Sequence, residues 1–128
     1  MVIPKKIRYL CIFLYFYGMN KSALYKGCLE PIILQLLKDN GRMYGYQITQ
    51  KARELTKGHL DITEGALYPL LHRLEEEGIL ETEIESVGNR MRKYYALTKA
   101  GKKQSIQSLN ELQSFLNNLS LIFQPKTA

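Results

Sequence analysis

Residues 43–97 constrain the fold of this chain most, because two helical patterns and a basic hairpin pattern follow one another there with little between them. The centre of the segment is ITEGALYPLLHRLEEEGIL, residues 62–80. It begins with small and polar residues and ends in a run of glutamates, and a positively charged pair of strands follows. A helix with these ends favours binding to nucleic acid over catalysis.

The length and charge of the chain indicate one domain with an anionic partner. The 128 residues, 45% of them hydrophobic, allow one modest core and an added element for self-association. The net charge of +6 and a pI near 9.3 favour an anionic partner. Residues 86–103 contain six bases and no acid, whereas residues 75–85 contain six glutamates and no base. We expect one face to bind phosphate and another to avoid it.

Cysteines and histidines give no sign of an active site or a metal site. Cys11 and Cys28 lack a metal-binding spacing and are too few for a disulfide framework, which favours the reducing cytoplasm. His59 and His72 have no neighbouring pattern that indicates zinc binding or a nucleophile–base pair. We expect no catalytic residues, no metal and no cofactor.

Residues 1–22 form an N-terminal extension whose role stays open. MVIPKKIRYLCIFLYFYG resembles the start of a secretory signal but lacks a small-residue cleavage pattern. Its apolar run is also shorter than the ~20 residues of a membrane-spanning helix. An added helix that contributes apolar surface to an oligomer, or a translation start misassigned ahead of Met19, is favoured. A weak membrane-surface anchor is the third interpretation, and membrane attachment is not expected.

Two amphipathic helices are predicted before residue 58. The first carries an apolar stripe of five residues and ends at Asn40–Gly41. The second runs from Tyr44–Gly45 to about Thr56, and Gly58 supplies the turn after it. The stripe of the first helix is Leu29, Ile32, Ile33, Leu36 and Leu37, and the inner face of the second is Ile48, Ala52 and Leu55.

A third helix is predicted from Thr63 to Gly78. Thr63 is a suitable N-cap, and Glu64 complements the helix dipole. Pro69 interrupts the pattern, but it lies in the first two turns, where the helix can start tight or bent. The apolar stripe continues across the proline and consists of Leu67, Leu70, Leu71 and Leu74.

Two strands, 81–86 and 91–97, are predicted to form a hairpin around residues 87–90, where Gly and Asn suit a tight turn. Arg90, Arg92 and Lys93 can then reach phosphates, and the tyrosines can pack on the third helix or contact sugar. The alternative interpretation is a solvated edge that prevents sheet-to-sheet pairing.

A long helix from Thr98 to about Phe123 is predicted to form a coiled-coil-like contact. So much apolar surface on a small chain favours a dimer, and the alternative is a helix folded back on its own domain. The expected dimer interface is Ile106, Leu109, Leu112, Phe115, Leu116, Leu119 and Phe123.

These patterns predict a mainly α protein with a small β-hairpin. We expect a winged helix-turn-helix domain at residues 23–97, a C-terminal dimerisation helix at 98–123, and a tail at 124–128.

Four segments together resemble the PadR-type bacterial transcriptional regulators: KGCLEPIILQLL, GRMYGYQITQKA, ITEGALYPLLHRLEEEGIL and GNRMRKYYALTKAGK. Their order and spacing match from about Lys26 to Lys103, and the short C-terminus is similar to the branch with a single C-terminal helix. The resemblance implies a homodimer, joined through the C-terminal and first helices, that represses transcription from operator DNA. A small aromatic or drug-like effector stays open, and a protein-binding or membrane-tethered adaptor is the alternative function.

By position, the resemblance also implies the DNA contacts. The start of the second helix approaches phosphate, the start of the third enters the groove, and the hairpin acts as a wing. Two such units would bind an inverted repeat in successive major grooves ~34 Å apart. The expected contacts are Tyr44, Gly45, Thr63, Glu64, Gly65, Ala66, Tyr68, Asn89, Arg90, Arg92 and Lys93.

Overall fold

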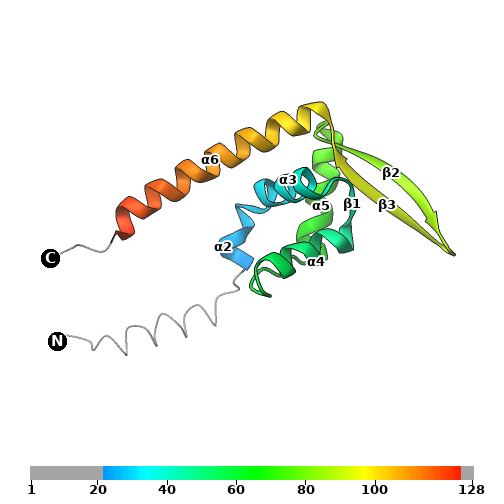
Figure 1. Cartoon of the computed structure of the whole chain (residues 1–128), viewed down its shortest axis with the longest axis horizontal. Helices are drawn as coiled ribbons and strands as arrows, with labels where there is room; N and C mark the ends of the chain where they lie inside the picture. The colour runs from blue at the N-terminus through cyan, green and yellow to red at the C-terminus, as the bar shows by residue number, and fades with distance from the viewer. Residues whose placement is uncertain (1–21, 125–128) are drawn as a thin grey trace.

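A computed structural model describes residues 22–124 and shows a mainly helical protein with one small antiparallel sheet (Figure 1). The predicted fold class is therefore confirmed. The interpretations of residues 1–21 and 125–128 fall outside the described part. The elements are α2 (Ser22–Lys26), α3 (Leu29–Asn40), β1 (Met43–Tyr44), α4 (Gly45–Leu55), α5 (Glu64–Glu76), β2 (Leu80–Val87), β3 (Arg90–Leu97) and α6 (Lys99–Phe123).

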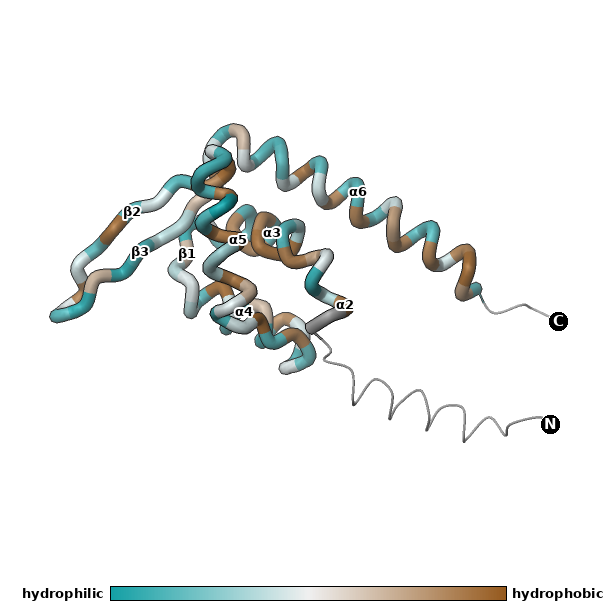
Figure 2. Tube along the Cα trace, turned by 180° about the vertical axis from the view of Figure 1, so that it is seen from behind, coloured by the Kyte–Doolittle hydropathy of each residue, from teal (hydrophilic) through white to brown (hydrophobic). Residues whose placement is uncertain are grey.

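Helix α3 lies at the centre of the core and packs against α4, α6 and β3. Ile33 and Leu34 are fully buried, and Leu36 and Leu37 are nearly so. Figure 2 shows apolar residues on α3 in the middle of the molecule and further apolar residues along α6 toward its C-terminus. The predicted stripe of α3 is confirmed, with Leu34 added to it and Ile32 only half-buried.

Helices α4 and α5 complete the core from the other side. Ile48 and Ala52 are buried as predicted, but the prediction for Leu55 is wrong, because its side chain is 63% exposed. The chain returns after α4 and buries Leu60 and Ile62 instead, so the last turn of α4 has no core left to contact. Helix α5 continues through Pro69, as its leucine stripe predicted.

The sheet has the strand order β1-β3-β2, so the hairpin is joined by a third strand that the sequence did not indicate. Met43 pairs with Tyr95 and Tyr44 with Tyr94. At the other end of the hairpin, Gly88 has a φ of 61°, whereas the next loop residue has a negative φ, as in a type II′ turn. The hairpin extends away from the helices (Figure 1).

The start of α6 is fixed to the loop that follows α5. The Thr98 hydroxyl donates to the carbonyl oxygens of Gly78 and Ile79, at 2.6 and 3.1 Å, and accepts from the Gly101 N–H at 3.0 Å. Gly101 is buried, and a Cβ at this position would overlap the Ile79 carbonyl oxygen. The glycine at position 101 therefore lets α6 pack closely against the backbone of Ile79, and this contact helps to set the direction of α6.

None of the helices within residues 22–124 is long and apolar enough to cross a membrane.

Replacing Gly101 with alanine is expected to lower the free energy of unfolding by about 1–3 kcal/mol, because the backbone of Ile79 must move to admit the methyl group. Chemical denaturation measures this loss. Lys102→Ala is the matched control on the next, exposed residue and should change stability by no more than about 0.5 kcal/mol. A Gly101→Ala protein as stable as the parent would contradict the proposed close contact.

Candidate nucleic-acid interface

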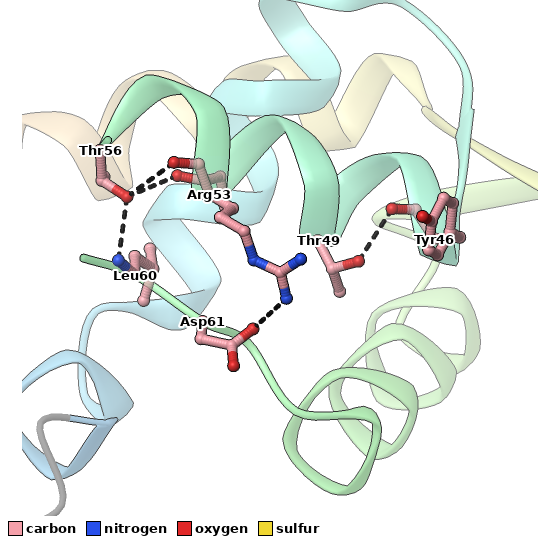
Figure 3. Close-up of polar contacts among 7 residues, drawn as sticks. Tyr46, Thr49, Arg53, Thr56, Leu60 and Asp61 are labelled. Atoms are coloured by element: carbon pink, nitrogen blue, oxygen red, sulfur yellow. Dashed lines mark hydrogen bonds and ion pairs between the residues drawn. The ribbon is translucent and has the colours of Figure 1, made fainter. Parts of the chain in front are cut away.

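The turn between α4 and α5 is held by the hydroxyl of Thr56 (Figure 3). This hydroxyl donates to the Ala52 carbonyl at 2.7 Å and accepts from the Leu60 N–H at 2.9 Å. Lys57 and Gly58 both have positive φ, which reverses the chain within two residues. These hydrogen bonds and backbone angles define the conformation of the turn and thereby the position of the segment that leads to α5.

An ion pair joins α4 to the segment before α5. Arg53 Nη2 donates to Asp61 Oδ1 at 2.6 Å, and both side chains point into the space between the two elements (Figure 3). Both side chains are largely exposed, so the pair contributes little to stability. Because Asp61 lies two residues before the N-cap of α5, the pair helps to orient the start of that helix.

The start of α5 is open to solvent. Thr63 is the N-cap and its hydroxyl accepts from the Ala66 N–H at 3.3 Å, so this prediction is confirmed. Thr63, Glu64 and Gly65 are exposed, whereas Ala66 is half-buried against the core. The unpaired N–H groups of a first helical turn favour the binding of an anion. The carboxylate of Glu64, which lies in the first turn of α5, would repel such an anion.

Tyr68 lies against the start of α4 because Gly45 has no side chain. Gly45 is buried, and a Cβ there would come within 2.6 Å of the Tyr68 hydroxyl oxygen. Tyr68 remains 39% exposed, with its ring held between the two helices. The absence of a side chain at Gly45 thus lets Tyr68 pack against the start of α4, and the phosphate contact that the resemblance implies for Gly45 stays a prediction.

Tyr44 links the wing to α4. The guanidinium of Arg92 lies 4.6 Å from the centre of the Tyr44 ring, and Tyr94 packs edge-on against the same ring with centroids 5.5 Å apart. The Tyr44 N–H donates to Gln47 Oε1 at 3.2 Å. Arg92, Tyr44, Gly45 and Tyr68 therefore form a continuous set of contacts around the start of α4.

The outer face of the sheet carries a paired cluster of charges that the sequence analysis missed. Arg42 donates to Glu83 at 3.0 Å and to Glu85 at 2.6 Å, and its guanidinium lies 4.4 Å from the centre of the Tyr94 ring. Glutamates at every second position of β2 were a signal that one face of the strand is acidic. Because two carboxylates face one guanidinium, Arg42 offsets only part of the negative charge on this face of the wing.

Lys93 points to the opposite face of the sheet from Arg92. Its ammonium donates to Glu75 Oε2 at 3.0 Å, and the Thr82 hydroxyl donates to the other oxygen of that carboxylate at 3.0 Å. The hydrogen bond from Lys93 lowers the pKa of the Glu75 carboxyl, and the bond to Glu75 raises the pKa of Lys93. Lys93 therefore joins the wing to α5 in the single copy, and its expected phosphate contact stays a prediction.

The tip of the wing presents Asn89 and Arg90 to solvent. Among residues 22–124, no ion pair involves Arg90 or Arg92. Of the three cations expected in the wing, these two therefore remain available to an anionic partner.

The seven residues of the expected dimer interface all lie along α6. Leu109, Leu112 and Leu119 are half-buried within the single copy. The remaining four, Ile106, Phe115, Leu116 and Phe123, each expose half or more of their side chain. The described residues contain no group of His, Cys, Asp and Glu that could hold a metal ion.

Comparison with known proteins places this arrangement in one family. The profile of the transcriptional regulator PadR-like family matches residues 33–107. A transcriptional regulator of Mycobacterium tuberculosis is 40% identical over 70 residues, which cover 55% of this chain and 62% of that protein.

Solved structures agree with this assignment. A transcriptional regulator from Clostridium thermocellum has a TM-score of 0.71 at 29% identity and covers 80% of this chain and 99% of its own. Bacillus subtilis PadR in complex with operator DNA has a TM-score of 0.58 at 30% identity, over 64% of this chain and 45% of its own. The expectation of a regulator and not an enzyme is confirmed, and the chain belongs to the PadR-like family of transcriptional regulators.

Proposed function

We propose that this regulator binds a specific operator as a homodimeric repressor, with the start of α5 in the major groove. The observation that carries the proposal is the open first turn of α5. Apart from its two chain neighbours and the nearby backbone of its own helix, no described atom lies within 4 Å of the place where a Cβ of Gly65 would stand. The DNA complex of Bacillus subtilis PadR, a protein of similar fold, supports the partner class.

The distribution of acids restricts how the domain could dock. Glu76 and Glu77 are exposed at the far end of α5, and Glu83 lies on the outer face of the sheet. These carboxylates would repel phosphates. Only the first turns of α5 therefore enter the groove, and the sheet meets DNA through its tip and not through its base.

The wing would supply phosphate contacts from Arg90 and Arg92. Arg92 is already ordered over the Tyr44 ring, so less side-chain entropy is lost when it binds. Arg90 lies at the exposed tip of the hairpin. Such contacts position a protein on the duplex, whereas contacts to base edges from the start of α5 would provide sequence selectivity.

A second copy would pair through the apolar seam of α6, in which Leu116 and Phe123 are exposed in the single copy. This seam, which is spaced by three and four positions as in coiled coils, consists of Leu109, Leu112, Leu116, Leu119 and Phe123. Two α5 helices related by a two-fold axis would bind half-sites about 34 Å apart. Binding across a promoter would then block transcription.

Replacing Gly65 with leucine is expected to reduce operator affinity by at least roughly tenfold, because the side chain would fill the space between α5 and the groove floor. Its stability should not fall, since leucine is a better helix former than glycine. His72→Leu is the matched control, seven residues later on the same exposed face of α5. Fluorescence anisotropy with operator DNA and a denaturation series distinguish the effects. Equal affinity for both variants would exclude the start of α5 from the groove.

Replacing Arg90 with alanine is expected to flatten the dependence of log affinity on log salt by about 0.9, the contribution of one phosphate contact. Lys93→Ala is the control in the same strand, because its ammonium is bound to Glu75. This control should leave the slope unchanged and lower stability slightly. Anisotropy titrations at several salt concentrations give both slopes, and a flatter slope for Lys93→Ala alone would reverse the assignment.

Replacing Leu116 with aspartate is expected to convert the dimer to a monomer, since a carboxylate in the seam would be buried without a partner. Asn117→Asp adds the same charge outside the seam and should leave the dimer intact. Sedimentation equilibrium measures both masses. If Leu116→Asp remained a dimer, the copies would have to pair through another surface.

A further inference from the structure

One flank of α4 borders the segment that leads to α5 and is open to solvent. Tyr46, Thr49 and Arg53 are spaced by three and four positions, so they lie together on this flank. Tyr46 is 63% exposed, and the side chain of Arg53 is 45% exposed. None of the three was among the DNA contacts expected from the sequence.

The guanidinium of Arg53 is only partly engaged (Figure 3). Its Nη2 donates to Asp61 Oδ1 at 2.6 Å, and the guanidinium makes no other hydrogen bond within residues 22–124. A guanidinium carries several N–H donors in a planar fork, so most of them remain available to a further acceptor. The carboxylate of Asp61 is largely exposed, so water competes for the contact.

This ion pair can be exchanged at little cost. An exposed pair with a single hydrogen bond contributes little to stability, so little is lost when it opens. A phosphate can accept two parallel N–H bonds from a guanidinium, which is a stronger arrangement. A phosphate and the Asp61 carboxylate carry charge of the same sign and repel one another. A phosphate that reaches Arg53 would therefore displace Asp61.

The position of Arg53 suits a phosphate at the edge of the groove. Its partner Asp61 lies two residues before Thr63, the N-cap of α5, and two residues of chain span at most about 7 Å. Arg53 is thus held close to the turn that would enter the groove. In helix-turn-helix proteins the first helix of the motif crosses the DNA backbone. The flank of α4 that borders α5 would then meet that backbone.

A second ion pair on α4 allows a comparison. Lys51 Nζ lies 3.7 Å from Glu54 Oε2. Both residues line a hollow with Asn40 and Arg42 that includes no residue of α5. They therefore lie on another side of α4 from Arg53, away from the turn that would enter the groove.

We propose that Arg53 contacts an operator phosphate, and that Asp61 holds the guanidinium until the phosphate displaces it. Asp61 thereby competes with the operator and weakens its binding. This contact, which rests on the proposed function, lies outside the wing and outside α5.

Arg53→Gln and Asp61→Asn, made separately in the full chain, test the exchange. The probe is a labelled duplex that the parent protein selects from a random-sequence pool, and anisotropy titrations are run at several salt concentrations. Arg53→Gln is expected to weaken binding and to flatten the dependence of log affinity on log salt by about 0.9, as one lost phosphate contact would. Asp61→Asn is expected to strengthen binding roughly threefold, because a carboxylate about 6 Å from a phosphate repels it in water.

Lys51→Gln and Glu54→Gln are the matched controls, because they remove the same two charges from the other ion pair of α4. Both should leave the salt dependence at the parental value and change affinity by less than about twofold, since salt screens charges at a distance. Chemical denaturation should give the same midpoint for the parent and all four variants, because exposed ion pairs contribute little to stability.

An unchanged salt dependence for Arg53→Gln, with selective binding by the parent, would overturn the Arg53 contact and leave the proposed function standing. Weaker binding by both Arg53→Gln and Asp61→Asn would also overturn it, because the ion pair would then serve only to orient the start of α5. A parent protein that selects no duplex would contradict the proposed function itself, and the Arg53 contact with it.

Discussion

The whole structure depends on burying the broad apolar face of α3. Ile33, Leu34 and Leu37 point in directions that no single neighbouring element can cover. Helices α4 and α5 and the sheet cover one side, and α6 covers another. The helix-turn-helix unit and the C-terminal helix therefore share one core. A change in the packing of α6 would be felt by the same residues that support α5.

Charged residues have different roles here according to strand alternation and position. Arg92 and Lys93 are adjacent in sequence, but one stacks on an aromatic ring at the outer face and the other is bound to Glu75 at the inner face. Arg42 is fully occupied by two glutamates. The net positive charge of the chain is thus a poor guide to where phosphate could bind, and a better guide is the pair of wing arginines, Arg90 and Arg92, that form no ion pair within residues 22–124.

Much of the fold could be predicted from the sequence, because the apolar stripes of α3 and α5 have clear helical spacing. The helix N-caps Thr63 and Thr98 and the Gly–Asn turn have strong local signals as well. Leu55 was misplaced because periodicity shows which face is apolar but not where the core ends. Strand β1 was missed because two residues are too few for alternation, and its pairing depends on a strand far along the chain.

The candidate site was harder to predict than the fold. Exposure of the start of α5 follows from local rules, but the partners of Arg42 and Lys93 come from residues more than fifteen positions away. The function of Gly45 could be seen only in three dimensions, since the atom it accommodates belongs to Tyr68 of another helix. Sequence spacing gives no information on such contacts.

In the proposed dimer, the close approach of Gly101 to Ile79 would also influence the length of the operator. With α6 locked at a set angle to α5, the point at which two α6 helices cross would determine the separation of the two DNA-contacting helices. Sliding that crossing by one heptad moves it by about 10 Å along the axis, or roughly three base-pair steps. The spacing of the leucines along α6 would then determine the half-site separation. Relatives in which these leucines lie at other positions of the helix would bind operators with a different half-site separation.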